Sequence, residues 1–358
     1  MKTVGYILAL ICATCWAPHA SAEISDSQYQ AFVSEAIEAH ARPRFEELGR
    51  RTEALYVHTR TACADSEDLN QNEIHQAFTE TVRAWSSAHH LRWGPARQEY
   101  RHERFAFGAD PANYVARQLG RIIQAGDPAL LDAEKLKAKS IAIQGLTAFE
   151  LLLVTPPATE ETRSYHCSLA EIISLNLRNM AAEMVAGWRA EADYVALLNS
   201  PDPEHLFIST DREAAMEFYK PMAGGIRFLI DIDLKDPMQN GIKTSRPHHA
   251  AYWRTQNSNI AIKAKLTALN AVFTETGFSD NLRTEDVELY TQMSKRFAAA
   301  HTAFDQLTLP MAEAVKDPEQ RKHIQDTIED LDALWSLIVY DMARIYGFKV
   351  GFNEFDGD

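Results

Sequence analysis

A short apolar stretch that carries a single carboxylate, residues 143–154, constrains the fold of this chain more than any other feature. It reads IQGLTAFELLLV, and Gln144, Thr147 and Glu150 recur every three residues within it. In a helix these side chains form one polar stripe on an otherwise apolar surface. Burying a carboxylate without a partner costs several kcal/mol, which is comparable with the stability margin of a whole domain. We therefore expect a packed helical interior in which Glu150 meets a cation, a metal ion or a set of hydrogen-bond donors.

The first residues are typical of an export signal. Lys2 precedes an apolar run over residues 4–16, and residues 20–22, Ala-Ser-Ala, fit a signal-peptidase site. The run is too short for a permanent membrane anchor, and no later stretch is long and apolar enough to cross a membrane. We expect cleavage after Ala22 and a periplasmic product. A lipoprotein attached at Cys15 is the disfavoured alternative, because the preceding threonine suits a lipobox poorly.

Charge and cysteine content narrow the class of protein further. The chain has 50 acidic and 36 basic residues, a formal net charge of −14, which disfavours a nucleic-acid partner. Beyond the expected cleavage site only Cys63 and Cys167 remain. In an oxidising compartment these two cysteines predict one structural disulfide, and two buried free thiols are the alternative.

Helical periodicity dominates the chain, and no alternating pattern typical of a strand hairpin appears. The expected helices cover residues 29–63 (kinked or split at Pro43), 72–93, 111–125, 133–154, 162–198, 211–232, 257–274, 284–307 and 317–346. The sequence Ser-Pro-Asp-Pro at 200–203 is the clearest internal boundary. The prediction is an all-α protein with an N-terminal helical bundle over residues 23–200 and a C-terminal bundle over residues 201–358.

Few of the other polar clusters suggest chemistry. Arg101 and Arg104 are the cations expected to partner Glu150, since a guanidinium binds both carboxylate oxygens and stays charged. A network of this kind can hold an anion or another ligand, or it can simply tie helices together. No His-Glu-x-x-His, Gly-x-Ser-x-Gly, phosphate-binding loop or dinucleotide fingerprint is present in the sequence.

The polar stripe also resembles the Gly-x-His-x-x-Glu signature of the imelysin-like family of bacterial envelope proteins. Gly145 and Glu150 match the signature, and Thr147 stands where the family has histidine. Weaker matches lie at Gly94, Pro95, Arg101, Arg104, Phe107 and Asp110, at residues 246–259 with Trp253 and Ser258, and at the acidic tail, residues 351–358. Cys63 and Cys167 also fall where the family tends to place cysteines. Together the matches span about residues 26–358.

The resemblance implies two packed four-helix bundles with a site in the cleft between them, in a periplasmic protein associated with iron acquisition. It implies a ligand-binding set of Thr147, Glu150, Arg101, Arg104, Asp110, Trp253 and Ser258. Glu150 is the candidate metal ligand, for iron or another metal ion. Thr147 lacks the nitrogen that would complete a metal pair with Glu150. Because a hydroxyl is a weak ligand, Glu150 would need help from Asp110, Glu99 or Asp356.

Three functions from different classes remain open. The first is a periplasmic binding or accessory protein of iron uptake, whose partners are a small ligand or metal ion and envelope iron-uptake proteins. The second is a metallopeptidase, which the missing protease motif disfavours. The third is a structural or interaction protein that has lost its metal site, with Thr147 donating a hydrogen bond to Glu150 in the core.

Overall fold

The computed structural model describes residues 24–65, 69, 71–278 and 286–348. The expected signal segment and the acidic tail with Asp356 lie outside these ranges. Within them every regular element is helical and no strand occurs, which confirms the expected all-α fold. No helix in the described part of the chain has both the length and the apolar character needed to cross a membrane.

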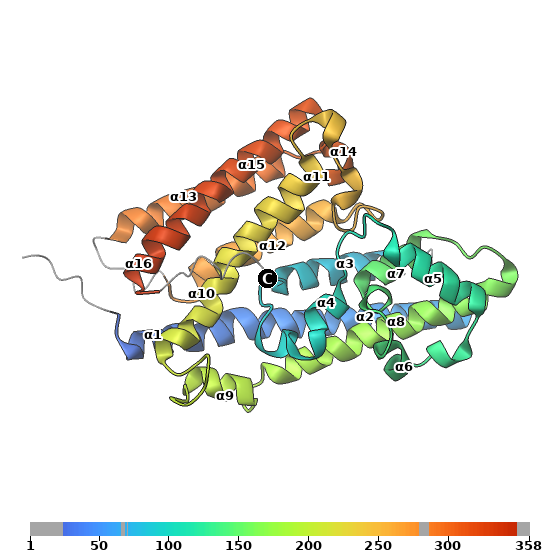
Figure 1. The fold of residues 1–358 in the computed structure, drawn as a ribbon, viewed down its shortest axis with the longest axis horizontal. Coiled ribbons are helices and arrows are strands. Elements are labelled where there is room, and N and C mark those ends of the chain that lie inside the picture. The colour runs from blue at the N-terminus through green and yellow to red at the C-terminus, as the bar shows by residue number, and fades with distance from the viewer. Residues whose placement is uncertain (1–23, 66–68, 70, 279–285, 349–358) are drawn as a thin grey trace, which may run out of the picture.

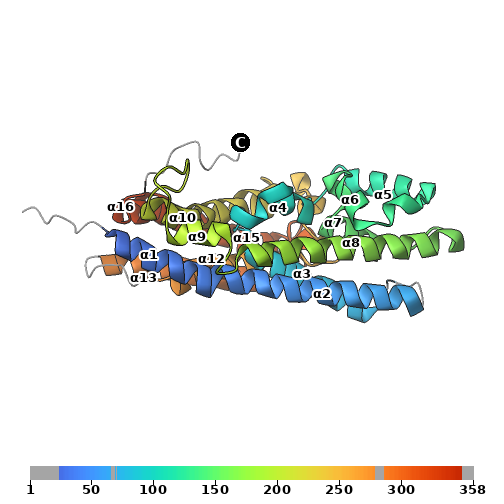
Figure 2. The same ribbon diagram turned by 90° about the horizontal axis from the view of Figure 1, so that it is seen from below.

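One long helical rod opens the fold. It consists of α1 (Asp26–Glu35), a π-helical turn η1 (Ala36–Ala41) and α2 (Arg42–Asp65), which run in line along one edge of the molecule (Figure 2). Pro43 lacks an N–H and would clash with the preceding turn of a regular helix. The wide π turn directly before it accommodates this defect, so the rod continues where the sequence predicts a kink or a break.

The elements before residue 200, here called the N-terminal half, pack around α2. The helices α3 (Asn72–Ala88) and α8 (Glu160–Gly187) lie along α2, and α7 (Leu146–Val154) packs on α8. The shorter helices are α4 (Arg101–Phe105), α5 (Tyr114–Ala125), α6 (Ala133–Lys137) and α9 (Asp193–Asn199). A disulfide joins Cys63 on α2 to Cys167 on α8 with a Cα–Cα distance of 5.5 Å, which confirms the predicted pairing and is typical of an oxidising compartment.

The elements after residue 200, here called the C-terminal half, form a second layer of helices. It contains α10 (Asp211–Phe228) with the π turn η6 (Leu229–Lys235), α12 (Ser258–Glu275), α13 (Val287–Asp305), and α15 (Pro318–Ser336) with the π turn η10 (Leu337–Met342). Three short helices complete it: α11 (Asp236–Met238), α14 (Met311–Ala314) and α16 (Ala343–Ile345). Figure 1 shows this layer, yellow to red, set obliquely on the blue and green helices.

The two halves share an extensive core. Helix α12 packs on α3, and α1 packs on α10, so the start of the N-terminal rod belongs to the contact between the halves. Gly225 on α10 allows this close packing, because a Cβ there would lie 2.6 Å from Leu269 and 3.1 Å from His90. The division of the chain at residue 200 into two domains stays a prediction.

Two long helices expected from periodicity are interrupted. The segment expected at 133–154 consists of α6, a 3-10 turn η5 (Ile141–Ile143) and α7, with Ser140 capping the turn between them. The segment expected at 162–198 ends as α8 at Gly187, and α9 begins separately at Asp193. Apolar periodicity continues through both breaks because the short pieces still face the same core.

Candidate functional site

Helix α7 begins where its backbone lies very close to the backbone at the end of α4. Gly145 directly precedes the helix, and a Cβ at this position would lie 2.3 Å from the carbonyl oxygens of both Arg104 and Phe105. Any other residue would push α7 away from the end of α4. The glycine therefore sets where the polar stripe lies relative to the segment that follows α4.

The first member of the stripe, Gln144, joins three segments. Its side-chain oxygen accepts a hydrogen bond from Arg104 Nε at 2.7 Å. Its amide nitrogen donates to the carbonyls of Lys139 at 2.6 Å and Lys137 at 3.2 Å. Buried side chains of this kind are stable only when such bonds are made, and Gln144 makes all of them within the protein.

Thr147 holds the segment that follows α4. Its hydroxyl donates to the carbonyl oxygen of Gly108 at 3.0 Å. The expected hydrogen bond from Thr147 to Glu150 is therefore wrong. A carbonyl 39 positions earlier in the chain takes the hydroxyl proton because α7 lies directly against that loop.

Glu150 is buried, with 1% of its surface exposed, and contacts a loop of the C-terminal half. Its Oε1 accepts two hydrogen bonds from Thr255, from the backbone N at 3.1 Å and from Oγ1 at 2.8 Å. Its Oε2 lies 3.8 Å from Nη1 of Arg254. Burial raises the pKa of Glu150 above its ordinary value, while the hydrogen bonds from Thr255 and the charge of Arg254 oppose that rise.

The expected pairing of Glu150 with Arg101 or Arg104 is wrong, because both arginines are engaged elsewhere. Arg101 pairs with Glu183 on α8, Nε to Oε2 at 2.5 Å, and donates to the Pro95 carbonyl at 3.0 Å. Arg104 binds Gln144, as described above. These arginines tie α4 to α8 and to the turn before α7, which is the structural alternative that the sequence left open.

The remaining residues of the expected ligand set also make internal contacts. Asp110 accepts hydrogen bonds from the backbone N atoms of Tyr114 at 2.7 Å and Val115 at 2.9 Å, at the start of α5. Ser258 Oγ donates to the Ala251 carbonyl at 2.6 Å. The ring of Trp253 stacks on His248 at 4.0 Å, with the guanidinium of Arg254 over it at 4.8 Å. Their contact with a ligand stays a prediction.

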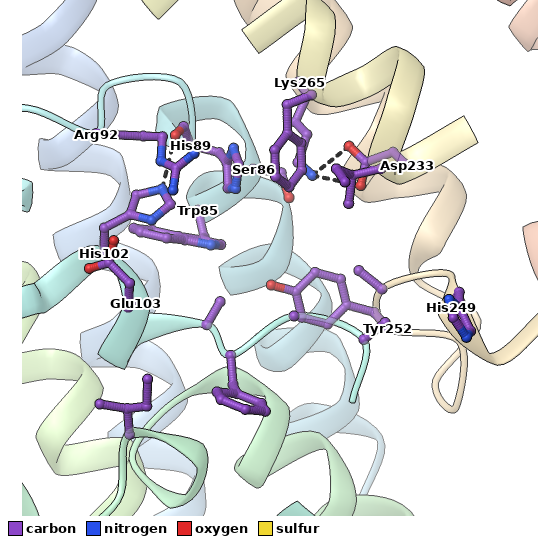
Figure 3. A pocket seen from close by; sticks show the side chains of 18 residues that line it. Trp85, Ser86, His89, Arg92, His102, Glu103, Asp233, His249, Tyr252 and Lys265 are labelled. Atoms are coloured by element: carbon purple, nitrogen blue, oxygen red, sulfur yellow. Dashed lines mark hydrogen bonds and ion pairs between the residues drawn. The ribbon is translucent and has the colours of Figure 1, made fainter. Parts of the chain in front are cut away.

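A cavity of about 340 Å³ lies between the two halves, beside the segments that the stripe holds (Figure 3). The N-terminal half supplies the end of α3, the start of α4 and residues 106–109. The C-terminal half supplies Phe228, two residues of η6, Lys265 of α12 and the loop residues 249, 251 and 252. The cavity therefore lies where the two halves meet, which is where the resemblance places a site.

A buried ion pair forms one side of this cavity. Lys265 Nζ lies 3.0 Å from Oδ1 and 2.7 Å from Oδ2 of Asp233, and also lies over the ring of Phe228 at 4.7 Å from its centroid. Burial raises the pKa of Asp233, and the neighbouring ammonium of Lys265 opposes that rise. The π turn η6 places Asp233 toward α12, in keeping with the frequent use of such turns at functional sites.

Two histidines form the opposite side. His102 Nε2 lies 3.0 Å from the carbonyl oxygen of His89, and the two rings are 4.8 Å apart. Burial and the neighbouring cations Lys265 and Arg92 hold the pKa of His89 well below its ordinary value. Burial and Arg92 lower the pKa of His102 to about 3. Both rings are therefore neutral at physiological pH.

Two hydroxyl groups complete the cavity. The Ser86 side chain is fully buried, and its Oγ has no hydrogen-bond partner within the described part of the chain. Tyr252 is held with φ of +56°, a conformation that costs about 1–3 kcal/mol for a residue other than glycine. Its ring extends into the cavity from the loop before α12 (Figure 3).

Residues of the polar stripe hold two parts of the cavity wall: the segment that contains Gly108 and the loop that contains Tyr252. Thr147 holds the Gly108 carbonyl, and Gly108 lines the cavity. Glu150 holds Thr255, whose hydroxyl is bonded in turn by Asn257 Nδ2 at 3.1 Å. Asn257 also closes the loop through its backbone N, which donates to the Tyr252 carbonyl at 3.0 Å. The motif helix thus positions the strained Tyr252 without entering the cavity, since neither Thr147 nor Glu150 lines it.

The residues at the motif do not fit a metal ion. Oε1 of Glu150 accepts two hydrogen bonds, Oε2 faces a guanidinium, and the Thr147 hydroxyl is bonded to a carbonyl. Among the residues that the structure describes, no group of three or more His, Cys, Asp or Glu side chains could hold a metal. Of the expected helpers, Glu99 pairs with Lys137 at 2.5 Å, and Asp110 caps α5.

The sequence did not identify Arg254 and Thr255 as the partners of Glu150, or Ser86, Tyr252, Asp233 and Lys265 as a cluster. One signal was present, although weaker than at Glu150: Asp233 and Lys265 each have apolar neighbours in a helical stretch, but Asp231 and Lys263 lie two positions before them. The same cost of burying an unpaired charge applies to Asp233 and Lys265.

Known proteins share this arrangement of helices. A family model described as Imelysin (Peptidase_M75) matches residues 41–338 of the chain. No curated protein matches it. The structure is similar to that of an imelysin-like protein from Psychrobacter arcticum 273-4, with a TM-score of 0.75 and 17% identity over 92% of this chain and 99% of that one.

It is also similar to the structure of a putative iron-regulated protein A precursor from Parabacteroides distasonis ATCC 8503. The TM-score is 0.72 at 14% identity, over 91% of this chain and 97% of that one. At such low identities the likeness concerns the fold, and it confirms the expected imelysin-like architecture.

Proposed function

The chain belongs to the imelysin family, and on this premise we propose that it is an exported binding or accessory protein of iron acquisition. Its ligand, a small molecule or a metal ion, is held in the cavity between the N-terminal and C-terminal halves. The protein acts in the periplasm after cleavage behind Ala22, and its protein partners are envelope components of iron uptake.

One observation carries this proposal: the cavity at the junction of the halves is lined by ionisable and hydroxyl groups from both. Pockets of about this volume, with a few polar groups among aromatic side chains, are typical ligand sites. The walls are held in place by buried hydrogen bonds from the motif helix. Such preorganisation reduces the entropy that the walls of the cavity would otherwise lose when a ligand binds.

Two further findings support the assignment to iron acquisition in the envelope. The Parabacteroides neighbour is called iron-regulated and a precursor. The disulfide between Cys63 and Cys167 is of the kind that persists in oxidising compartments.

A structural or interaction protein with a lost metal site is the second candidate. The observation in its favour is that the side chains of Gln144, Thr147 and Glu150 are all hydrogen-bonded to other groups of the protein. Peptidase activity is not proposed, because the motif that would position a catalytic zinc is missing from the sequence.

Analysis of the protein purified from its own cell envelope separates these candidates. Native mass spectrometry and elemental analysis would be applied to the wild type and to His89→Trp, which fills the cavity with a larger ring. The matched control is His58→Trp, at an exposed position on α2. We expect a bound molecule or metal in the wild type and in the control, and its loss in His89→Trp. If none of the three proteins carries a bound molecule or metal under iron limitation or iron excess, the second candidate, a structural or interaction protein, is favoured.

A further inference from the structure

Building on the proposed function, we propose that the cavity recognises an oxyanion, the carboxylate or phosphate group of a small molecule, and does not bind a bare metal ion. If this is correct, iron reaches the protein only as part of an anionic chelate. The inference depends on which polar groups remain free after the protein has made its own hydrogen bonds.

The hydroxyl groups that remain free can donate. Ser86 Oγ is fully buried and has no partner within the described residues, although serine on a helix commonly donates to a carbonyl one turn earlier. Tyr252 extends into the same space, and its hydroxyl makes no hydrogen bond within the described part of the chain. Burial, with Glu150 and Asp233 nearby, raises the pKa of Tyr252, so the phenol keeps its proton and can donate it.

The ammonium group of Lys265 has one further proton to donate. A lysine carries three N–H groups, and two of them serve the two oxygens of Asp233. No hydrogen bond within the described residues uses the third, and Lys265 lines the cavity. Lys265 is only 7% exposed, so a ligand oxygen would meet this charge with little screening by water.

The carboxylate in the interior of the cavity is already used. Both oxygens of Asp233 accept from Lys265, so a cation would have to displace an ammonium ion to reach a carboxylate. The two neutral histidines lie close to the positive charges of Arg92 and Lys265. A bare cation would therefore meet repulsion and no free carboxylate in the interior, whereas an oxyanion would meet donors.

The mouth of the cavity is electrically balanced. Arg92 and Glu103 both line it and are exposed, and within the described part of the chain neither forms an ion pair. The preference for an anion therefore comes from the interior donors Ser86, Tyr252 and Lys265. These residues, and not the charges of the mouth, are the ones to change.

Isothermal titration of the full mature chain tests the proposal with three probes: citrate, inorganic phosphate and Fe²⁺ under anaerobic conditions. The variants Tyr252→Phe and Ser86→Ala each remove one hydroxyl and keep the shape of the cavity. The matched controls are Tyr340→Phe and Ser336→Ala, both at exposed positions. Thermal unfolding of each variant verifies that it is folded.

We expect citrate or phosphate to bind, and each cavity variant to weaken binding about tenfold, the typical effect of losing one hydrogen bond to a charged group. The controls should bind as the wild type does. A preference for citrate over phosphate identifies a carboxylate ligand, and the reverse identifies a phosphate.

Three outcomes would overturn the inference. Binding of Fe²⁺ alone, lost in His89→Trp, would leave the proposed function standing and refute the preference for an anion. Anion binding that neither hydroxyl variant weakens would place the anion outside the cavity. Binding of neither the anions nor the metal would overturn the proposed function as well.

Discussion

Replacing Glu150 tests how a buried charge is held across the junction of the two halves. In Glu150→Ala the backbone N–H and hydroxyl of Thr255 lose their acceptor, and the guanidinium of Arg254 keeps its charge at a site only 9% exposed. Removing one partner of a buried pair typically costs about 3–5 kcal/mol, and here two donors of Thr255 are left unpaired together with the charge of Arg254. We expect the free energy of unfolding of Glu150→Ala to fall by about this amount.

Glu150→Gln separates charge from shape. The amide oxygen can still accept from Thr255, and burial already disfavours the charged carboxylate, as the raised pKa of Glu150 indicates. The loss should therefore be smaller than in Glu150→Ala, because the acceptor for Thr255 remains and only the counter-charge of Arg254 is removed. The matched control is Glu191→Ala at an exposed position, where substitutions change stability by less than about 0.5 kcal/mol.

The raised pKa also gives a pH dependence with a definite sign. The folded state binds the Glu150 proton more tightly than the unfolded state, whose pKa is about 4.3. The contribution of this group is fully present below the unfolded pKa and falls as the pH rises through the folded pKa. Glu150→Gln lacks this dependence, so its stability relative to the wild type should improve as the pH rises above about 4.3.

Urea unfolding followed by circular dichroism at 222 nm, on oxidised protein at several pH values, gives these free energies. If Glu150→Ala and Glu150→Gln both unfold like the wild type, the carboxylate is not held as described. If Gln costs as much as Ala, charge and not hydrogen bonding dominates the site, and the interpretation of the raised pKa fails.

Three further predictions concern other contacts of the same framework. Gly145→Ala should lower stability by about 1–3 kcal/mol, because its Cβ would clash with two carbonyls of α4, and a melting curve like that of the wild type would contradict this close approach. Replacing Cys63 and Cys167 by serine should cost about 2–5 kcal/mol, since the bridge closes a loop of 104 positions, and dithiothreitol should destabilise the wild type but not the double variant. Lys265→Met should destabilise the protein by about 3–5 kcal/mol through the stranded carboxylate of Asp233, and adding Asp233→Leu should recover much of the loss in a double-mutant cycle; an additive result would show that the pair is uncoupled.

The sequence was sufficient to predict that Glu150 is buried but not which residue partners it. Burial follows from its apolar neighbours along one helix, which is a local property. The partner depends on which loop of the other half reaches α7, and Arg254 is 104 positions further on. Arg101 is nearer to Glu150 along the chain than Arg254 is. In the fold, however, Arg101 pairs with Glu183 on α8.

The all-helical fold and the disulfide were also predictable. Apolar periodicity indicates the helices, and the presence of two cysteines after the expected cleavage site indicates the disulfide. The interruption between α6 and α7 was not, since apolar spacing continues across the turn at Ser140. The cavity was not predictable either. Its polar residues come from α3, α4, η6, α12 and the loops after α3 and before α12, and they meet only through packing between the halves.

Hydrogen–deuterium exchange at the Thr255 amide tests most directly whether the motif helix fixes the walls of the cavity. This N–H donates to Oε1 of Glu150 in the folded protein. We predict that Glu150→Ala strongly accelerates exchange at Thr255 and through residues 252–257, while Glu150→Gln preserves most of the protection and Glu191→Ala all of it. Unchanged protection of this loop in Glu150→Ala would contradict the account.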